Sequence, residues 1–400
     1  MSDLAGWVDR TGVRLATPLD GAAQDIAPLE AALGPIIAGA DLVFLGEMNH
    51  FVHEKSDFRL LLARFLLRHG VSVFAEELGW SDGERLARWF AGADDGALDG
   101  LSLFGSEEGA RSDRDDHPTG LFAASFKTYP REQMRFEQER FYRGLKAAGP
   151  PAGYFGFDID ALPGAGYADI ARRLAPRARE PAVGEFLKRM ARAPGETAAE
   201  EGARLSALAP PPDPAAAAAL AALADSFRYI ALTYPAATYE AVRPGMAYRE
   251  EAMKRRFADL RRLSGGAPAA VMSHGLHLAK DDGLIGEAPG VGPGGGQTAS
   301  IGHHLTQDLG LKVASIWMLY GAGEDSQPMP DLPRKAAYPA DTLNAELAHL
   351  AAPTLFPIAG GPFSAPRKVG HMYNAVVPVT LAGTVDAILF LPRVTPMRTR

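Results

Sequence analysis

The chain has 400 residues, of which 47% are hydrophobic and 22% are charged, an ordinary globular composition that excludes global disorder. Its 41 basic and 48 acidic residues give a formal charge of −7. This balance disfavours nucleic acid as the main partner, since phosphate binding needs a clustered basic surface. The sequence contains no cysteine, which excludes disulfides, thiolate metal sites, iron–sulfur clusters and a cysteine nucleophile.

The beginning of the chain contains acidic residues and no continuous apolar core, so it does not have the pattern of a Sec-type signal peptide. No run of about 18 apolar residues occurs, and the alanine-rich stretch Ala215–Ala224 is too short to cross a bilayer. We therefore expect a soluble, cytoplasmic protein with no membrane partner.

Short apolar runs alternate with amphipathic helical patterns, which indicates an α/β fold with a central, mostly parallel sheet flanked by helices. Each predicted strand is bounded by glycine, proline or charged residues, as buried parallel strands tend to be. The strands are expected at Leu42–Leu45, Val71–Ala75, Gly153–Phe157, Ala269–Met272, Val313–Met318 and Ala387–Leu391. Helices are expected at about 26–39, 54–69, 82–91, 130–147, 166–175, 214–232, 248–263 and 341–351.

The chain is predicted to form a single α/β domain over residues 1–400 with two additions. Residues 92–119 are acidic and rich in glycine, which is typical of a long surface or lid loop. Residues 176–247 contain helical patterns broken by prolines, and they predict an inserted helical subdomain that covers one end of the sheet.

The first candidate cluster follows the strand at 42–45, where Glu47, His50, His53 and Glu54 occur within eight residues and Arg59 follows on the next helix. Open α/β sheets bind their ligands at the carboxyl ends of their strands. Carboxylates beside a histidine there can tune the imidazole as a general base near neutral pH. The alternative is the start of a helix with a solvated charged face.

Two further clusters follow predicted strands. Glu76 and Glu77 end an apolar strand, and the alternation of side chains predicts that one faces the site and the other the opposite side. His274 and His277 follow the strand at 269–272 with a spacing of three, which places both imidazoles on one face if a helix begins there. The same spacing occurs in metal ligation. The alternative is that His274 and His277 are two loop histidines without a shared function.

Several common catalytic motifs are absent. The sequence has no Walker A loop, no HExxH pair, and no G-x-G-x-x-G after a strand. A dinucleotide-binding enzyme is therefore poorly supported. One G-x-S-x-G sequence, GWSDG at residues 79–83, follows the predicted strand at Val71–Ala75.

The ordered set of motifs resembles the erythromycin esterase family. The resemblance is carried by LGEMNHFVHE (45–54) with Arg59, the ELGW stretch that begins at Glu77, and YFGFDID (154–160). It continues with YREEAM (248–253), MSHGLH (272–277), IGHHL (301–305) and VDAILFLPRVTP (385–396), so that it extends over nearly the whole chain.

The resemblance implies hydrolysis of a carboxylic ester, in known members the macrolactone of a macrolide, by a water that a histidine activates. It assigns His50 as the general base, Glu47 and Glu77 as groups that orient the base or the water, Arg59 as their cationic partner, and His274 as a second acid/base or oxyanion stabiliser. It implies that His277, His53, Glu54, Glu76 and Asp158 contact the substrate, with no covalent intermediate, cofactor or metal.

Three alternatives stay open. The same histidine and glutamate residues could serve a biosynthetic enzyme that lactonises, dehydrates or rearranges a polyketide-like substrate. The scaffold could also bind a ligand without turnover, because a fold is shared more widely than an activity. The third alternative is a single metal ion held by His50, His53, His274 and His277 together with a glutamate.

Overall fold

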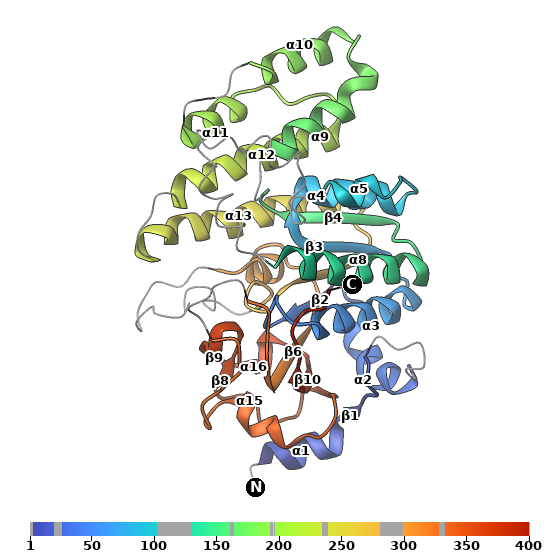
Figure 1. The fold of residues 1–400 in the computed structure, drawn as a ribbon, viewed down its shortest axis with the longest axis vertical. Helices are drawn as coiled ribbons and strands as arrows, with labels where there is room; N and C mark the ends of the chain where they lie inside the picture. Colours follow the sequence, from blue (N-terminus) through green and yellow to red (C-terminus); the bar gives the residue numbers. More distant parts are fainter. Residues whose placement is uncertain are drawn as a thin grey trace. The chain divides into compact units, whose positions relative to one another are not determined.

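The computed structural model describes residues 3–19, 26–101, 130–160, 164–192, 195, 197–233, 239–280, 299–327 and 333–399 (Figure 1). The chain divides into two compact units. The first unit consists of Met1–Phe74, Glu132–Ala152 and Ala267–Arg400, and the second of Ala75–Arg131 and Gly153–Gly266.

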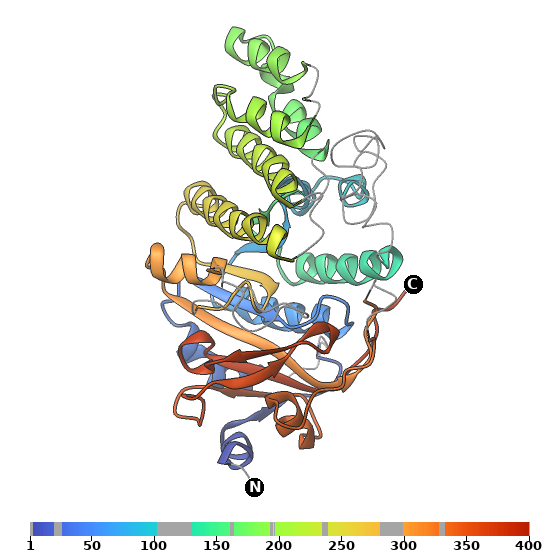
Figure 2. The ribbon, with the colours of Figure 1, turned by 90° about the vertical axis from the view of Figure 1, so that its left-hand side faces the viewer.

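The first unit contains a mixed, mostly parallel sheet with the strand order β1-β7-β10-β6-β2-β5. The strands β5, β2, β6 and β10 run parallel to one another, and β7 and β1 add an antiparallel edge. Figure 2 shows β6 and β10 side by side in orange and red. The strand bounds are β1 Val13–Arg14, β2 Leu42–Glu47, β5 Ala269–His274, β6 Val313–Gly323, β7 Thr354–Pro357 and β10 Ala387–Val394.

All six residues of β2 and of β5 are buried, as expected for central parallel strands covered on both faces. Large apolar side chains such as Trp317, Phe356 and Phe390 form a core on this sheet. Helix α3 follows β2 with acidic residues in its first turn and Arg68 in its last turn, a distribution that complements the helix dipole.

The remaining elements of the first unit are helices, short helical turns and a small antiparallel pair of strands, β8 and β9. Their bounds are α1 Asp3–Thr11, α2 Ala27–Ile37, α3 Glu54–Arg68, α8 Arg131–Ala148, α14 Ile301–His303, the π turn η3 His304–Asp308, α15 Leu343–Glu346, η4 Leu347–His349, β8 Arg367–Gly370, η5 Met372–Asn374, β9 Val376–Val379 and α16 Leu381–Thr384.

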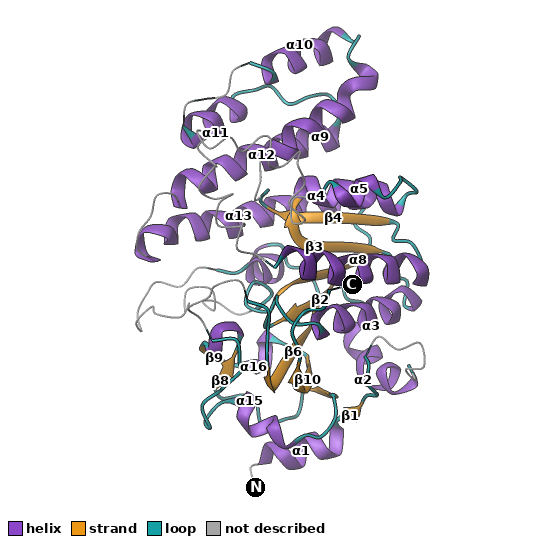
Figure 3. Cartoon of the chain, in the orientation of Figure 1, coloured by secondary structure: helices purple, strands orange, loops and turns teal. Residues whose placement is uncertain are grey.

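The second unit combines two neighbouring strands with a set of helices (Figure 3). The strands are β3 Val73–Gly79 and β4 Gly153–Asp158, and the helices are α4 Trp80–Phe90, α5 Gly96–Asp99, α9 Gly164–Leu174, η2 Ala175–Arg177, α10 Pro181–Met190, α11 Ala198–Ser206, α12 Pro214–Thr233 and α13 Tyr239–Leu263. Thr197 and Glu200 begin α11 with a complete capping box.

Helix α12 is the one helix in the described part of the chain that is long and apolar enough to cross a membrane. Within its apolar window 61% of the residues are buried, and its alanines belong to the core of the second unit. Core packing therefore accounts for the apolar character of α12, as in a soluble α/β protein, and the cytoplasmic location stays a prediction.

The predicted α/β class and the mostly parallel sheet are confirmed, and each of the six predicted strands is present. The strands β1, β7, β8 and β9 were not predicted because each has at most four residues. Helix α13 begins before its predicted start, since it continues through Pro244.

The interval 176–247 holds α10, α11, α12 and the beginning of α13. Of the predicted loop 92–119, residues 92–101 include the short helix α5, and 102–119 lie outside the described residues. The single domain with a helical insertion stays a prediction.

Candidate active site

The first candidate cluster lies at the carboxyl ends of β2 and β5. These strands are parallel neighbours, and their register places Glu47 opposite His274. The backbone N–H of Gly275 donates to the carbonyl of Glu47 over 2.7 Å. A Cβ atom at Gly275 would lie 2.6 Å from the sulfur of Met48, so a larger residue there would require the Met48 side chain to move.

Glu47 is fully buried and has two partners in the first unit. Its Oε1 accepts a hydrogen bond from Arg59 Nη2 over 2.9 Å and lies 3.1 Å from His50 Nδ1. Burial raises the pKa of this carboxyl, but the Arg59 cation and the hydrogen bond with His50 outweigh burial and lower the pKa to about 2. Glu47 is therefore a fixed carboxylate at neutral pH.

His50 is the more accessible partner of this pair. Its side chain is 29% exposed, whereas that of Glu47 is 0% exposed. Glu47 engages Nδ1, and Nε2 makes no hydrogen bond within the described residues. The second oxygen of Glu47, Oε2, is also without a partner in this part of the chain. The pair thus offers one unoccupied nitrogen and one unoccupied carboxylate oxygen.

Further imidazoles surround this pair. The ring of His274 lies 5.2 Å from that of His50 and 6.4 Å from that of His277, measured between ring centroids. The Nδ1 atom of His274 accepts a hydrogen bond of 3.3 Å from the N–H of Leu276. In neutral His274 this bond assigns the proton to Nε2, which makes that atom a donor.

Sequence reasoning missed a fourth imidazole, His371, which follows β8. Its ring centroid lies 5.7 Å from that of His274, in an edge-to-face arrangement. The residue is 3% exposed, and burial lowers its pKa to about 4, so its imidazole is neutral at pH 7. The sequence offered only a lone histidine after an unpredicted four-residue strand as a signal.

A buried hydrogen-bond network fixes the loop that carries His50. The side-chain amide of Asn49 donates to Tyr320 Oη over 2.9 Å and to Asp325 Oδ2 over 2.7 Å. Its Oδ1 accepts from the N–H of Phe51 over 2.8 Å. Because Asn49 immediately precedes His50, these bonds restrict where the imidazole of His50 can lie.

His53 and Glu54 contact other parts of the first unit. His53 Nδ1 lies 2.6 Å from Glu137 Oε1 on α8, and its Nε2 lies 3.6 Å from Asp57 Oδ2. Glu54 accepts two hydrogen bonds of 2.8 Å from the backbone and hydroxyl of Thr395. His53 is thus hydrogen-bonded to Glu137 and lies near Asp57. A substrate contact for His53 and Glu54 stays a prediction.

The second unit contains its own charged cluster. Arg249 on α13 donates from Nε to Asp158 Oδ1 over 2.8 Å and from Nη2 to Asp158 Oδ2 over 2.5 Å. It also donates from Nη2 to Glu77 Oε1 over 2.7 Å. Burial lowers the pKa of Arg249, but Asp158 and Glu77 outweigh burial and raise it well above its usual value.

Glu76 and Glu77 contact different elements, in agreement with the side-chain alternation of a strand. Glu76 is 2% exposed and accepts a hydrogen bond of 2.5 Å from the hydroxyl of Tyr154 on β4, whereas Glu77 contacts Arg249 on α13. The structure therefore joins Glu77 with Asp158 in the second unit, and it joins Glu47, His50, Arg59, His274 and His277 in the first. A contact of Glu77 with the base stays a prediction.

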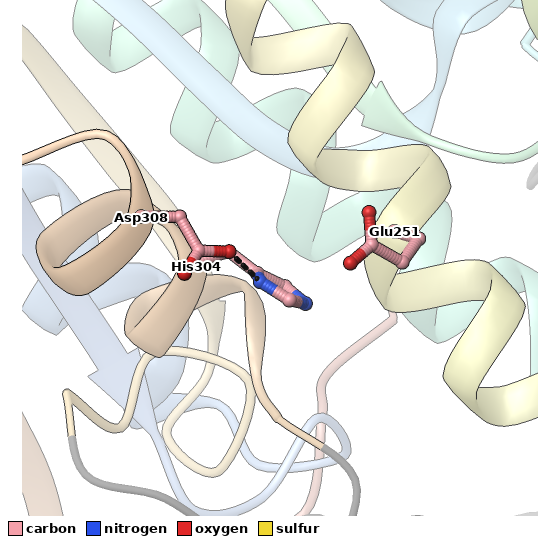
Figure 4. A group of neighbouring side chains, drawn as sticks. All are labelled: Glu251, His304 and Asp308. Atoms are coloured by element: carbon pink, nitrogen blue, oxygen red, sulfur yellow. Dashed lines mark hydrogen bonds and ion pairs between the residues drawn. The ribbon is translucent and has the colours of Figure 1, made fainter.

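A further histidine–carboxylate pair lies on the π turn η3 of the first unit. His304 Nδ1 lies 2.7 Å from Asp308 Oδ2, four residues later (Figure 4). Glu251, which Figure 4 also labels, belongs to the second unit and is not part of this pair. His304 belongs to the IGHHL motif of the sequence.

Comparison with solved structures supports the fold. A succinoglycan biosynthesis protein matches with a TM-score of 0.69 and 15% identity, over 99% of this chain and 97% of the other. A mutant of the erythromycin esterase EreC in its open conformation matches with a TM-score of 0.62 and 17% identity, over 96% and 98%. A protein from Bacillus cereus matches with a TM-score of 0.64 and 14% identity, over 99% and 98%.

Comparisons by sequence alone add nothing, since no protein-family model and no curated protein matches the chain. The chain therefore has an erythromycin esterase-like α/β fold over nearly its whole length. At 14–17% identity this likeness establishes the fold and leaves the reaction to be argued from the side chains.

Proposed function

We propose that the protein hydrolyses a carboxylic ester of a small molecule, with a macrolactone as the preferred class, by means of a water activated on His50. The observation that carries this proposal is the pairing of His50 Nδ1 with Glu47 Oε1 at 3.1 Å, with Arg59 bonded to the same oxygen. An ionised carboxylate at Nδ1 leaves Nε2 as the basic nitrogen of the imidazole.

The proton transfers follow from this geometry. Nε2 of His50 takes a proton from water while the hydroxide attacks the ester carbonyl carbon. The imidazolium that forms is stabilised by the Glu47 carboxylate, which cannot take the proton because its pKa is about 2. General base catalysis of this kind contributes about 10²–10⁴-fold to the rate. No covalent intermediate is needed.

His274 is placed for the second half of the reaction. Its ring lies 5.2 Å from that of His50, and its Nε2 carries the proton in the neutral form. It can donate a hydrogen bond to the oxyanion of the tetrahedral intermediate. As the C–O bond breaks, the His50 imidazolium gives its proton to the leaving oxygen, directly or through His274, so that both imidazoles end neutral. We assign Glu77 to the orientation of the base or the water, and His277, His53, Glu54, Glu76 and Asp158 to substrate contacts, on the family resemblance of their motifs.

A biosynthetic reaction on the same scaffold is the second candidate, favoured by the match to a succinoglycan biosynthesis protein. The same base and donor could close a lactone or dehydrate a polyketide-like substrate. The two candidates differ in the mass of the product: hydrolysis adds one water to the substrate, whereas lactonisation or dehydration removes one.

The test is mass spectrometry of the purified protein incubated with a panel of macrolides and simple aryl esters, beside His50→Ala. We expect an ester to gain one water with the wild-type protein and to stay intact with the variant. A folded protein that changes no ester would overturn the hydrolase proposal and favour the biosynthetic or ligand-binding alternatives. Metal analysis and chelator treatment of the same preparation test the metal alternative.

A further inference from the structure

We infer that His371 is an additional member of this site that donates an N–H hydrogen bond to the oxyanion of the substrate while it keeps its own proton. This inference rests on the proposed ester hydrolysis and extends it to a residue that the sequence motifs do not include. It starts from the bonding of the His371 ring.

Both ring nitrogens of His371 lack a hydrogen-bond partner within the described residues, although the residue is 3% exposed. Buried polar groups are nearly always hydrogen-bonded, and a native exception needs an explanation. A phenyl ring would fill the same space without this cost. A polar ligand that binds at the ring would supply the missing partner.

The position of the His371 ring indicates that this ligand is the substrate of the proposed reaction. His371 contacts the ring of His274 at 5.7 Å, and His274 contacts the ring of His50 at 5.2 Å. The backbone N–H of Met372 also donates to the carbonyl of Met48 over 2.8 Å, two residues before His50. The segment that carries His371 is thus bonded directly to the loop that carries the base.

This segment is held at several further points. The side-chain amide of Asn344 accepts from the N–H of Gly370 over 2.7 Å and donates to its carbonyl over 3.2 Å. The hydroxyl of Tyr338 donates to the carbonyl of His371 over 3.2 Å. A Cβ atom at Gly370 would lie 2.3 Å from the ring of Tyr338, so this packing needs glycine. A side chain on such a fixed backbone is well placed to act without reorganisation.

The protonation state of His371 suits a donor. Burial lowers its pKa to about 4, so the ring is neutral near pH 7 and carries one N–H. A neutral imidazole can stabilise an oxyanion by hydrogen bonding without giving up its proton, whereas a protonated ring would compete as an acid. His371 therefore complements His50, which must accept a proton.

The test uses His371→Phe, which removes the donor, and His371→Gln, which keeps an N–H donor. Turnover is measured with para-nitrophenyl butyrate, and binding is measured with the monoanion of para-nitrophenyl methylphosphonate, a tetrahedral mimic. His349→Phe, an exposed histidine on η4 whose Nδ1 contacts its own turn, is the matched control.

For His371→Phe we expect kcat to fall about 100-fold and KM to change less than about threefold, because an oxyanion donor acts mainly in the transition state. Binding of the phosphonate should weaken at least about tenfold, and the melting temperature should stay equal or rise, because an unsatisfied polar group has been removed. His371→Gln should recover part of the lost kcat.

The outcomes separate the two proposals. Normal kcat and normal phosphonate binding in His371→Phe would overturn the role of His371 and leave ester hydrolysis intact. A lower melting temperature in both variants, with equal losses of activity, would identify a structural role and also overturn it. A wild-type protein that hydrolyses no ester but binds the phosphonate through His371 would overturn the hydrolysis alone. A wild-type protein that does neither would overturn both.

Discussion

The polar clusters of the two units differ in how completely their hydrogen-bonding atoms are used. In the first unit, Glu47 Oε2, His50 Nε2 and both nitrogens of His371 have no partner within the described residues. In the second unit, Arg249 donates to both oxygens of Asp158 and to Glu77. One cluster leaves atoms for a ligand, and the other connects two strands and a helix by ion pairs.

The difference indicates where chemistry can occur. A buried charge that is fully paired contributes to a specific fold, whereas buried polar atoms without partners are found where a substrate, water or ion completes the bonding. This comparison agrees with our proposal that the reacting groups lie in the first unit. The role of Glu77 most needs testing, because Glu77 already binds Arg249 and is also proposed to orient the base or the water.

The largest effect on turnover is expected from His50→Ala. The variant removes the proposed base, and turnover should fall by about 10³-fold or more. The fold should be kept, since His50 is partly exposed and only its bond to Glu47 is lost. His69→Ala, which removes an exposed histidine paired with Glu30, is the control and should keep the wild-type rate. A His50→Ala variant with normal turnover would mean that another group is the base.

Glu47→Gln is expected to have the largest effect on stability. It leaves the buried Arg59 without its carboxylate, which typically costs about 3–5 kcal/mol, measured by urea unfolding. The stabilisation by Glu47 has a defined pH dependence, because folding lowers its pKa from 4.5 to about 2. It is complete above the unfolded pKa and is lost as pH falls through about 2.

The difference in stability between wild type and Glu47→Gln should therefore be constant above about pH 5 and shrink below it. A difference that stays constant down to about pH 3 would show that Glu47 is not a low-pKa carboxylate in the folded protein. Turnover of the variant should also fall, since His50 loses the group that stabilises its imidazolium.

The local part of the site could be predicted from the sequence. Glu47 and His50 are three residues apart at a strand exit, and Arg59 follows on the helix that begins at Glu54. The family resemblance implied that His274 belongs to the same site, and the structure adds that its strand, β5, is the parallel neighbour of β2. These relations depend on short spacings and on one rule of sheet topology.

The remaining contacts of the site join segments that are far apart in the sequence. A local pattern of apolar and polar residues carries no information about them. Asn49 bonds to Asp325, 276 residues away, and Arg249 bonds to Asp158, 91 residues away. His371 follows a strand of only four residues, too short to give an alternating pattern. The pairing of His53 with Glu137 on α8 is another contact of this kind, 84 residues apart in the sequence.

Glu77→Gln tests whether Glu77 acts in turnover or only in the ion-pair cluster of the second unit. If Glu77 orients the base or the water in addition to binding Arg249, turnover should fall about ten- to hundredfold. Arg249 keeps its bonds to both oxygens of Asp158, so stability should change little. Glu185→Gln, which weakens an exposed pair with Arg189, is the control. A normal rate in Glu77→Gln would confine Glu77 to the ion-pair cluster and make Glu76 the carboxylate to test next.

The smallest effect on turnover is expected at a buried carboxyl of the second unit, Asp160, which has no cation in hydrogen-bond contact within the described residues. Asp160 accepts two hydrogen bonds of 3.0 Å from the N–H and hydroxyl of Ser81 at the start of α4. Burial raises its pKa from 3.8 to about 7, with further raising by Asp82, whereas the bonds from Ser81 lower it. Glu47 is buried to the same degree, but Arg59 reverses the sign of its shift.

A carboxyl whose pKa is raised on folding gives its full stabilisation below the unfolded pKa, near 3.8, and loses it as pH rises through about 7. Asparagine is neutral at every pH, so Asp160→Asn should become more stable relative to wild type between about pH 4 and pH 8. The relative gain between these pH values should be on the order of 4 kcal/mol, because each unit by which the pKa is raised costs the ionised form about 1.4 kcal/mol. Urea unfolding at both pH values measures it, and a difference in stability between variant and wild type that stays constant between them would show that Asp160 is ionised without penalty.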